Sequence, residues 1–455
     1  MILDETEADD TRILGGGEWI RERWWYRIIQ VCRRWRYLVL ESASHLRLSL
    51  VCARGTPVAD MLAHSPPLPL IINHFDTHHD LSAEDEEGIN LALQHRYRVR
   101  RIRVTKPIPI LQKFIHALDG EFPILEYLFI MYKWYLGPMN ERDTNLKLSE
   151  TFQAPHLRQL VLMNFAVPIE SPILATMANL VNLSLISIPP SAYFPPSALL
   201  QRLSLLPQLE TLGIDFNFYN PSRDVETQLL RMPNSTRVTL PNLRWLGFRG
   251  VCAYLEALLP WVTIPHLEKL QVCFFNRMVY SIPHLQQFLS AAKTFRPKNA
   301  TFTFFNNFLN VTAYPYNGAK IYTMYLEFGG KHLDWQVLSA GQIFHALRTV
   351  FSAVEHLTLK YNRRNISSEW NNEAGRTQWR ELLGLFGKVK TLFVDGGLVV
   401  QLSRALQPGE EESPTELLPE LQELSHSATG ASYNAFTLFV DARQKIGHPV
   451  TVIHP

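Results

Sequence analysis

One short apolar pattern recurs along the chain and restricts the folds that are open to it. The pattern is L-x-x-L-x-L, in which Ile, Val or Phe replaces some leucines and proline often comes first. Eight clear copies run from PILEYLFI to KVKTLFV, at intervals of roughly 23 to 35 residues against a usual 20 to 29. A single copy cannot bury its apolar side, whereas stacked copies bury one continuous core. We therefore expect an elongated array of repeated strands. The anchors are Leu125/Leu128/Ile130, Leu157/Leu160/Leu162, Leu180/Leu183/Leu185, Leu209/Leu212/Ile214, Leu243/Leu246/Phe248, Leu267/Leu270/Val272, Val354/Leu357/Leu359 and Val389/Leu392/Val394, with weaker copies at Val99/Ile102/Val104, Phe302/Phe304 and Leu421/Leu424.

This pattern is typical of leucine-rich repeats, in which a short strand is followed by a loop and a returning helix. Segments with helical spacing lie between the copies, among them ILQKFIHAL, YLEALLPWV, LQQFLSAA and WRELLGLF. The ninth consensus position is Asn only at Asn217 and Asn362, so we expect long and unequal units. The predicted fold class is α/β, an irregular, horseshoe-like solenoid. Residues 301–327 alternate aromatic and polar residues for longer than one repeat strand needs, which predicts extra or longer strands there.

The patterns divide the chain into four predicted parts. Residues 1–50 form an acidic tail and a short helical module, and residues 51–95 a linker that leads into the repeats. The solenoid occupies 96–430, and 431–455 form a C-terminal cap or tail.

Composition excludes several classes of protein. Apolar residues make up 46% of the 455 residues and charged ones 19%, which predicts a folded chain. The net charge of +2 gives no global attraction to nucleic acid or to a membrane. Cys32, Cys52, Cys252 and Cys273 are far apart, so neither a disulfide framework nor a zinc ribbon is expected. Without a signal peptide or an apolar run of about 20 residues, we expect a cytoplasmic or nuclear protein that binds no membrane, metal or cofactor.

A second motif, VCRRWRYLV, stands once near the start of the chain. Ile28, Ile29, Val31, Cys32, Trp35, Leu38 and Val39 follow helical spacing, which predicts a buried stripe with Arg33, Arg34 and Arg36 on the solvent side. The motif resembles the final part of an F-box, and LRLSLVCARGTPVADMLAHSPPLPLII and residues 250–289 are similar to mushroom-type fungal F-box and leucine-rich-repeat proteins. The matching positions are Val31, Cys32, Trp35, Arg36 and Leu38.

The resemblance implies a non-catalytic function. In that family the F-box binds a Skp-type adaptor of a cullin-RING ubiquitin ligase, and the repeats capture a protein substrate. The usual opening of the module, L-P-x-E-[IL]-L-x-x-I-F, has no counterpart in MILDETEADDTRILGGGEWIRER. Two alternatives stay open: an upstream segment is missing, or the protein is a repeat scaffold that no longer docks the adaptor.

Nucleic-acid binding through the arginine-rich front is a third and more remote alternative. RERWWYR and HRYRVRRIRV combine arginine with aromatic residues, as surfaces for single strands do. Val99, Ile102 and Val104 alternate with these arginines at repeat-strand spacing, which favours the solvated outer face of a strand instead.

The repeat pattern also predicts where a partner binds. Residues between the inward anchors point to the opposite sheet face, where solenoids usually bind their partners. Trp245, Tyr127 and Arg249 are residue types that dominate interface energies, although Trp245 packed under a neighbouring loop is an even alternative. The predicted face comprises Tyr127, Phe129, Gln159, Asn182, Thr211, Asp215, Trp245, Arg249, Lys269, Gln271, His356, Lys360 and Thr391.

The remaining clusters indicate no chemistry. NHFDTHHD, residues 73–80, holds metal-ligand residue types, but we interpret it as a solvated loop, and the acidic runs at 84–87 and 410–412 as exposed loops. No nucleophile elbow, HExxH, phosphate-binding loop or dinucleotide fingerprint occurs, so we expect no enzyme.

Overall fold

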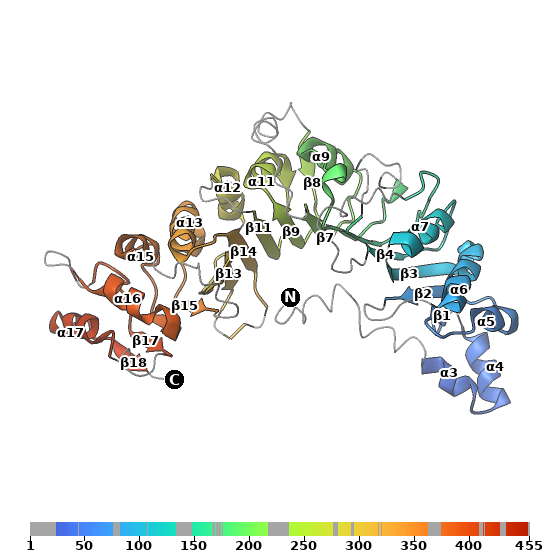
Figure 1. Ribbon diagram of the computed structural model, residues 1–455, viewed down its shortest axis with the longest axis horizontal. Helices are drawn as coiled ribbons and strands as arrows, with labels where there is room; N and C mark the ends of the chain where they lie inside the picture. The colour runs from blue at the N-terminus through green and yellow to red at the C-terminus, as the bar shows by residue number, and fades with distance from the viewer. Residues whose placement is uncertain are drawn as a thin grey trace. The chain divides into compact units, whose positions relative to one another are not determined.

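The computed structural model describes residues 24–453 except 44, 76–81, 107, 133–147, 166–168, 170–173, 175, 217–235, 276–280, 293–294, 317, 320, 363–374, 409–412, 414 and 428–433. It divides into two compact units, residues 1–193 and 194–455. In each unit strands and helices alternate along the chain, as predicted for an α/β leucine-rich-repeat solenoid (Figure 1).

Unit 1 is built on a sheet of six parallel strands in chain order. The sheet starts at Leu50, so residues 51–95, the predicted linker, contribute strands and helices to it. Its elements are α3 (Trp24–Ile29), α4 (Arg33–Glu41), β1 (Leu50–Ala53), α5 (Val58–His64), β2 (Leu70–His74), α6 (Ala83–Gln94), β3 (Val99–Lys106), α7 (Ile108–Ala117), β4 (Tyr127–Tyr132), β5 (Gln159–Met163) and β6 (Asn182–Ile186), with 3-10 turns at Arg96–Arg98 and Pro190–Ala192.

Unit 2 continues the same pattern with one interruption. Its sheet order is β7-β9-β11-β14-β13-β12-β15-β16-β17-β18, and a small parallel pair, β8 and β10, lies apart. The elements are α9 (Pro196–Leu203), β7 (Thr211–Asp215), β8 (Val238–Thr239), β9 (Trp245–Gly250), α11 (Cys252–Leu258), β10 (Val262–Thr263), β11 (Lys269–Phe274), α12 (Pro283–Ala291), β12 (Asn299–Phe304), β13 (Phe308–Tyr314), β14 (Met324–Gly329), α13 (Leu333–Ala346), α14 (Arg348–Phe351), β15 (His356–Tyr361), α15 (Arg376–Leu383), β16 (Thr391–Val394), α16 (Val399–Leu406), β17 (Glu423–His426), α17 (Thr437–Lys445) and β18 (Thr451–Ile453), with 3-10 turns at Leu259–Trp261 and Gly396–Leu398.

The interruption confirms the extra strands predicted within residues 301–327. Strand β13 runs antiparallel between β12 and β14, while β14 pairs parallel with β11 and β12 with β15. A two-strand insertion thus enters the parallel ladder without breaking it. Because the insertion is even in number, the next repeat strand keeps the original direction.

The anchors of the repeat pattern form the core, as predicted. Each anchor side chain is at most 4% exposed. Full burial of a Leu or Val side chain contributes about 1.5–3 kcal/mol, so the stacked anchors supply much of the driving force for folding. The predicted helical segments form α7, α11, α12 and α15 on one face of the sheets (Figure 1).

Two asparagine side chains form hydrogen bonds between neighbouring repeats, as the asparagines of the consensus ladder would do. The side-chain amide of Asn179 donates to the carbonyl of Pro155 at 3.2 Å, and that of Asn242 to Pro207 at 3.1 Å. Each Asn stands directly before the first anchor of its repeat, and each Pro opens the repeat before it. These bonds satisfy turn carbonyls that the helices and strands leave unpaired.

Candidate functional site

The candidate site lies on the open face of unit 2, meaning the sheet face that carries the residues alternating with the buried anchors. Strand geometry sends successive side chains to opposite faces, so burying Leu246 and Phe248 on one side turns Trp245 and Arg249 to the other. Of the predicted residues in this unit, Lys360 is exposed and the others are half-buried: Thr211, Asp215, Trp245, Arg249, Lys269, Gln271, His356 and Thr391.

The Trp245 indole lies along its own strand, over Gly247. A Cβ atom at position 247 would stand only 2.3 Å from Cη2 of Trp245, so the benzo ring fills the space that any other side chain would take. Trp245 stays half-buried and keeps part of its surface on the open face. The glycine thus gives the open face a large aromatic surface.

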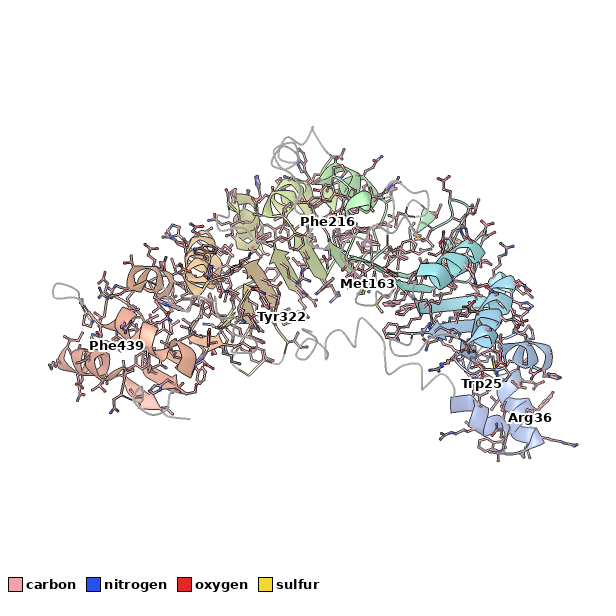
Figure 2. All side chains as sticks on the ribbon, in the orientation of Figure 1. Trp25, Arg36, Met163, Phe216, Tyr322 and Phe439 are labelled. Carbon is pink, nitrogen blue, oxygen red and sulfur yellow. The ribbon has the colours of Figure 1, made fainter. Side chains whose placement is uncertain are left out.

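A second aromatic group lies beside the neighbouring strand. The Lys269 ammonium sits 4.0 Å from the ring centroid of Tyr322, and the Tyr322 hydroxyl is 3.5 Å from Oε1 of Gln271. Lys269 is in register with Trp245, so this lysine–tyrosine pair lies on the strand next to that of Trp245 (Tyr322 is labelled in Figure 2). Tyr322 and Tyr325 rings are 5.9 Å apart.

Charged residues complete the patch. Arg249 on β9 donates to Glu327 on β14 at 2.9 Å, across Cys273 of β11, which is in register with both. The Tyr325 hydroxyl donates to the other Glu327 oxygen at 2.7 Å. Burial disfavours the charge of Arg249, but the carboxylates of Glu327 and Asp215 outweigh it and raise its pKa. The guanidinium therefore stays charged and held in place.

Burial and the Glu327 carboxylate also suppress ionisation of the Tyr325 hydroxyl and the Cys273 thiol, which belong to the same cluster. Burial, helped by Glu327, raises the pKa of Tyr325, and burial raises that of the Cys273 thiol well above its usual value. Neither group is an activated nucleophile or base at neutral pH. The cluster is suited to hydrogen bonding rather than to catalysis.

We name Trp245, Lys269, Tyr322, Arg249 and Glu327 the aromatic–charged patch. The sequence pattern identified the first, second and fourth of these. It missed Glu327 because this residue belongs to an inserted strand, although the alternation in MYLEF was a usable signal. It missed Tyr322 because this residue lies just before that strand, outside any repeat copy.

The open face of unit 1 is different in character. Gln159 is exposed, and Tyr127 and Asn182 are half-buried, but Phe129, predicted to contact a partner, is fully buried. Its ring meets Phe75 edge to face at 5.5 Å. Val51 and Ile71 form an apolar cluster on the same face, with Ala53 and Tyr127 packed against it. The prediction for Phe129 is wrong because the Phe75 ring and the Arg103 guanidinium pack against its ring.

Some arginines of the arginine-rich front have a structural role. Arg98 is buried and donates to the carbonyls of Leu68 and Pro66. Arg103 is also buried, with its guanidinium 3.6 Å from the Phe75 ring centroid. Arg100 pairs with Glu126 at 2.9 Å. The prediction of a solvated outer face is therefore wrong for Arg98 and Arg103, whose fork geometry suits carbonyl capping and ring stacking.

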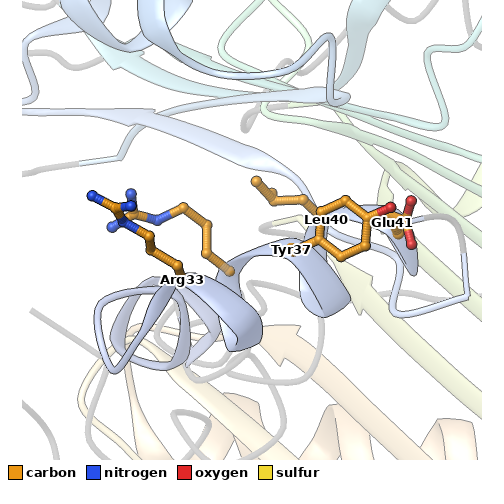
Figure 3. Close-up of a pocket in the computed structure, with 5 residues that line it drawn as sticks. Arg33, Tyr37, Leu40 and Glu41 are labelled. Atoms are coloured by element: carbon orange, nitrogen blue, oxygen red, sulfur yellow. The ribbon is translucent and has the colours of Figure 1, made fainter.

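The short helix of the VCRRWRYLV motif also departs from its prediction. Val39 is the buried residue of α4, whereas Val31, Trp35 and Leu38 are 67%, 50% and 53% exposed and Cys32 and Arg36 are exposed as well. The predicted buried stripe is therefore confirmed at Val39 and wrong at Val31, Cys32, Trp35 and Leu38, which lie on the solvent side. Arg33, Arg36, Tyr37, Leu40 and Glu41 line a shallow pocket on α4 (Figure 3).

The acidic run at 84–87 is not a loop. It forms the first turn of α6, where Ser82 and Asp85 make a reciprocal capping box and Asp85 also accepts from the Gly55 amide at 2.8 Å. Acidic residues at a helix start are stabilised by the helix dipole. The prediction of a solvated loop for NHFDTHHD is wrong at Asn73 and His74, which belong to strand β2, with His74 only 3% exposed. Residues 76–80 of this segment and the other acidic run, 410–412, lie outside the described residues.

Within the part of the chain that the structure describes, no group of His, Cys, Asp and Glu side chains could hold a metal ion, and none of the four cysteines forms a disulfide. No described helix is long and apolar enough to cross a bilayer.

Comparison with known proteins adds little. No protein-family model matches the chain, and no curated protein matches its sequence. Among solved structures, the chain is similar to the leucine-rich repeat-containing protein LegL7 from Legionella pneumophila, at 10% identity and a TM-score of 0.28, over 87% of this chain and 97% of that one. The fold assignment therefore rests on the strand ladder and its buried anchors.

Proposed function

We propose that the protein is a non-catalytic leucine-rich-repeat scaffold that binds a protein partner on the open face of unit 2. The observation that carries this proposal is the aromatic–charged patch, in which Trp245, the Lys269–Tyr322 pair and the Arg249–Glu327 pair occupy neighbouring strands. Aromatic and arginine side chains of this kind supply most of the energy at protein interfaces.

The rigidity of the patch favours binding. Trp245 is held over Gly247, and Arg249 is fixed by Glu327 and by its charged surroundings. Side chains already held in place lose less conformational entropy when a partner arrives, which leaves more of the contact energy for affinity.

Site-specific photo-crosslinking tests this proposal. A photoreactive phenylalanine analogue is placed at Lys360, which is exposed on the open face, and in a control protein at Gln287, which is exposed on α12. We expect a protein adduct from position 360 in an extract of the producing cells, and loss of that adduct when Trp245→Ala is added. Equal adducts from both positions, or an adduct indifferent to Trp245→Ala, contradict the proposal.

A second candidate function is substrate capture for a ubiquitin ligase, as the F-box resemblance implies. It is favoured by the exposure of Trp35 and Leu38 on α4 and of Val31 in the turn before it, because exposed apolar side chains on one short segment suit a protein contact. In this proposal α4 docks a Skp-type adaptor, and the open face of unit 2 binds the substrate.

The affinity of the full chain for the host's Skp adaptor tests the ligase proposal. A Kd near micromolar or tighter, roughly −8 kcal/mol, weakened at least tenfold by Trp35→Ala, supports it. The control is Leu205→Ala, an exposed apolar residue of unit 2. Absence of binding, or equal weakening by both variants, leaves the scaffold function without the ligase.

A further inference from the structure

One row of side chains crosses the open face of unit 2 without a charged residue. Its members face one another in register from strand to strand, from β7 to β18. We call it the uncharged row: Gly213, Gly247, Gln271, Tyr325, Thr312, Thr301, Thr358, Phe393, Ser425 and Ile453.

The chemistry of the row is that of neutral hydrogen bonding. Its central part carries one amide, one phenol and three threonine hydroxyls on five adjacent strands, from β11 to β15, all half-buried. Hydroxyl and amide groups both donate and accept. The Tyr325 hydroxyl already donates to Glu327 and so offers the row only its acceptor side, whereas the amide and the three threonine hydroxyls supply neutral donors and acceptors on the neighbouring strands.

Among the described residues beside the row, positive and negative side chains are equal in number. On one side Arg249 pairs with Glu327, and Asp215 and Lys360 stand in the same register. On the other side Lys269 lies over the Tyr322 ring, and Glu423 is in register with Thr391. His356 Nδ1 is 2.7 Å from the Thr391 hydroxyl. A charged ligand laid along the row would lose water and meet no opposite charge within it, which is costly. A neutral ligand meets no such penalty.

The row has the length of a short extended peptide. Ten strands give nine spacings of about 4.8 Å, or about 43 Å in all. An extended chain rises about 3.3 Å per residue, so about 13 residues span it. Peptide N–H and C=O groups match the neutral donors and acceptors of the row.

We infer that the uncharged row binds an extended polypeptide segment that carries few or no charged side chains. The inference rests on the proposed scaffold function and specifies its ligand: the segment crosses the strands, its backbone bonds to the row, and Trp245 contacts an apolar side chain. Charge complementarity selects this occupant over a nucleic acid or a strongly acidic or basic peptide, for which the row offers no counter-charge.

A displayed library of random peptides of about 12 residues, selected against the full chain, tests the inference. We expect the selected peptides to be depleted in Asp, Glu, Lys and Arg relative to the input library. Their affinity, measured by fluorescence anisotropy, should change less than about twofold between low and high salt, because no net charge is exchanged.

Two variants locate the binding. Thr312→Lys places a charge in the middle of the row and should weaken the selected peptides at least about tenfold, since a desolvated unpaired charge is costly. Thr358→Val removes one hydroxyl at constant shape and should weaken them a few-fold even if Thr312→Lys folds poorly. Gln287→Lys on α12 adds the same charge outside the face and should have no effect.

The outcomes separate this inference from the proposed function. Selected peptides rich in charged residues, or peptides indifferent to both threonine variants, overturn the inference. A library without binders also overturns the inference. If the photo-crosslinking experiment still gives a partner adduct at position 360, the scaffold function stands without the inference. If that experiment gives no adduct, both the scaffold function and the inference are overturned.

Discussion

Arg244 Nη1 lies 2.6 Å from Glu268 Oε1, and the two residues hold the same position in successive repeats. Opposite charges also meet at this position in Arg100 and Glu126, and Glu355 binds both Lys298 and Lys390. Exposed pairs contribute at most about 1 kcal/mol each. In these pairs, acidic and basic residues alternate at this position from one strand to the next. A strand that paired with the wrong neighbour would bring like charges together, so the alternation favours the correct order of repeats.

Replacement of Gly247 should destabilise the protein. In Gly247→Ala the new methyl group would overlap the Trp245 ring, so the indole must move or the sheet must strain, at a cost of about 1–3 kcal/mol. Urea denaturation measures the loss, and the tryptophan emission spectrum should shift.

The matched control for that prediction is Gly341, within α13. Its Cβ would meet no atom within 4 Å. Gly341→Ala should therefore stabilise the protein by about 0.5–1 kcal/mol, because alanine loses less backbone entropy in a helix. Equal effects of the two substitutions would contradict the steric account of Trp245.

Trp25 and Trp35 should differ in the stability that is lost when each is truncated to alanine. Trp25 is 2% exposed and its indole N–H donates to the Ser49 carbonyl, so Trp25→Ala should cost about 3–5 kcal/mol. Trp35 is 50% exposed, and Trp35→Ala should change stability by no more than about 0.5 kcal/mol. Thermal melts compare the two; a large loss from Trp35→Ala would mean that its side chain packs inside the fold.

Stability should fall as pH falls below neutral because of His74. Burial first, and Lys106 second, lower the pKa of this histidine from 6.5 to about 4. Between these values the unfolded chain binds the proton that the folded one rejects, so acid favours unfolding. At pH 5 the loss is about 2 kcal/mol relative to pH 8.

The His74→Leu variant isolates this contribution. Neither ring nitrogen of His74 has a hydrogen-bond partner among the described residues, so the substitution leaves no donor or acceptor stranded. As pH falls from 6.5 to 4, the unfolding free energy of the wild type should decrease relative to that of the variant. A difference that stays constant over this range would disprove the assignment.

Arg443 should be essential to the C-terminal end of unit 2. It is 1% exposed and donates to the carbonyls of Leu418, Pro419, Leu421 and His448. Arg443→Leu leaves these four carbonyl oxygens without a donor and should lower the free energy of unfolding by about 3 kcal/mol. Arg443→Lys should recover little, because an ammonium lacks the planar fork.

Hydrogen exchange measures the Arg443 effect locally. Exchange in α17 and β18 should accelerate in Arg443→Leu and stay unchanged in Arg404→Ala, which alters an exposed arginine of α16. Unchanged exchange in both proteins would show that the carbonyl contacts are dispensable.

The amino-acid pattern by itself determined the repeated strands, their buried anchors and the helices between them. These depend on local periodicity: an anchor such as Leu246 is apolar at a fixed spacing, and burial follows from that spacing alone. The same alternation placed Trp245, Arg249 and Lys269 on the open face.

Only the tertiary structure decided which of those face residues are available. Phe129 and Gly247 occupy equivalent repeat positions, between the second and third anchors. Neighbouring side chains bury Phe129, whereas Gly247 makes room for the Trp245 ring. Tyr322 and Glu327 reach the patch because the inserted strands reorder the sheet. Such contacts join residues far apart in sequence, and no local period encodes them.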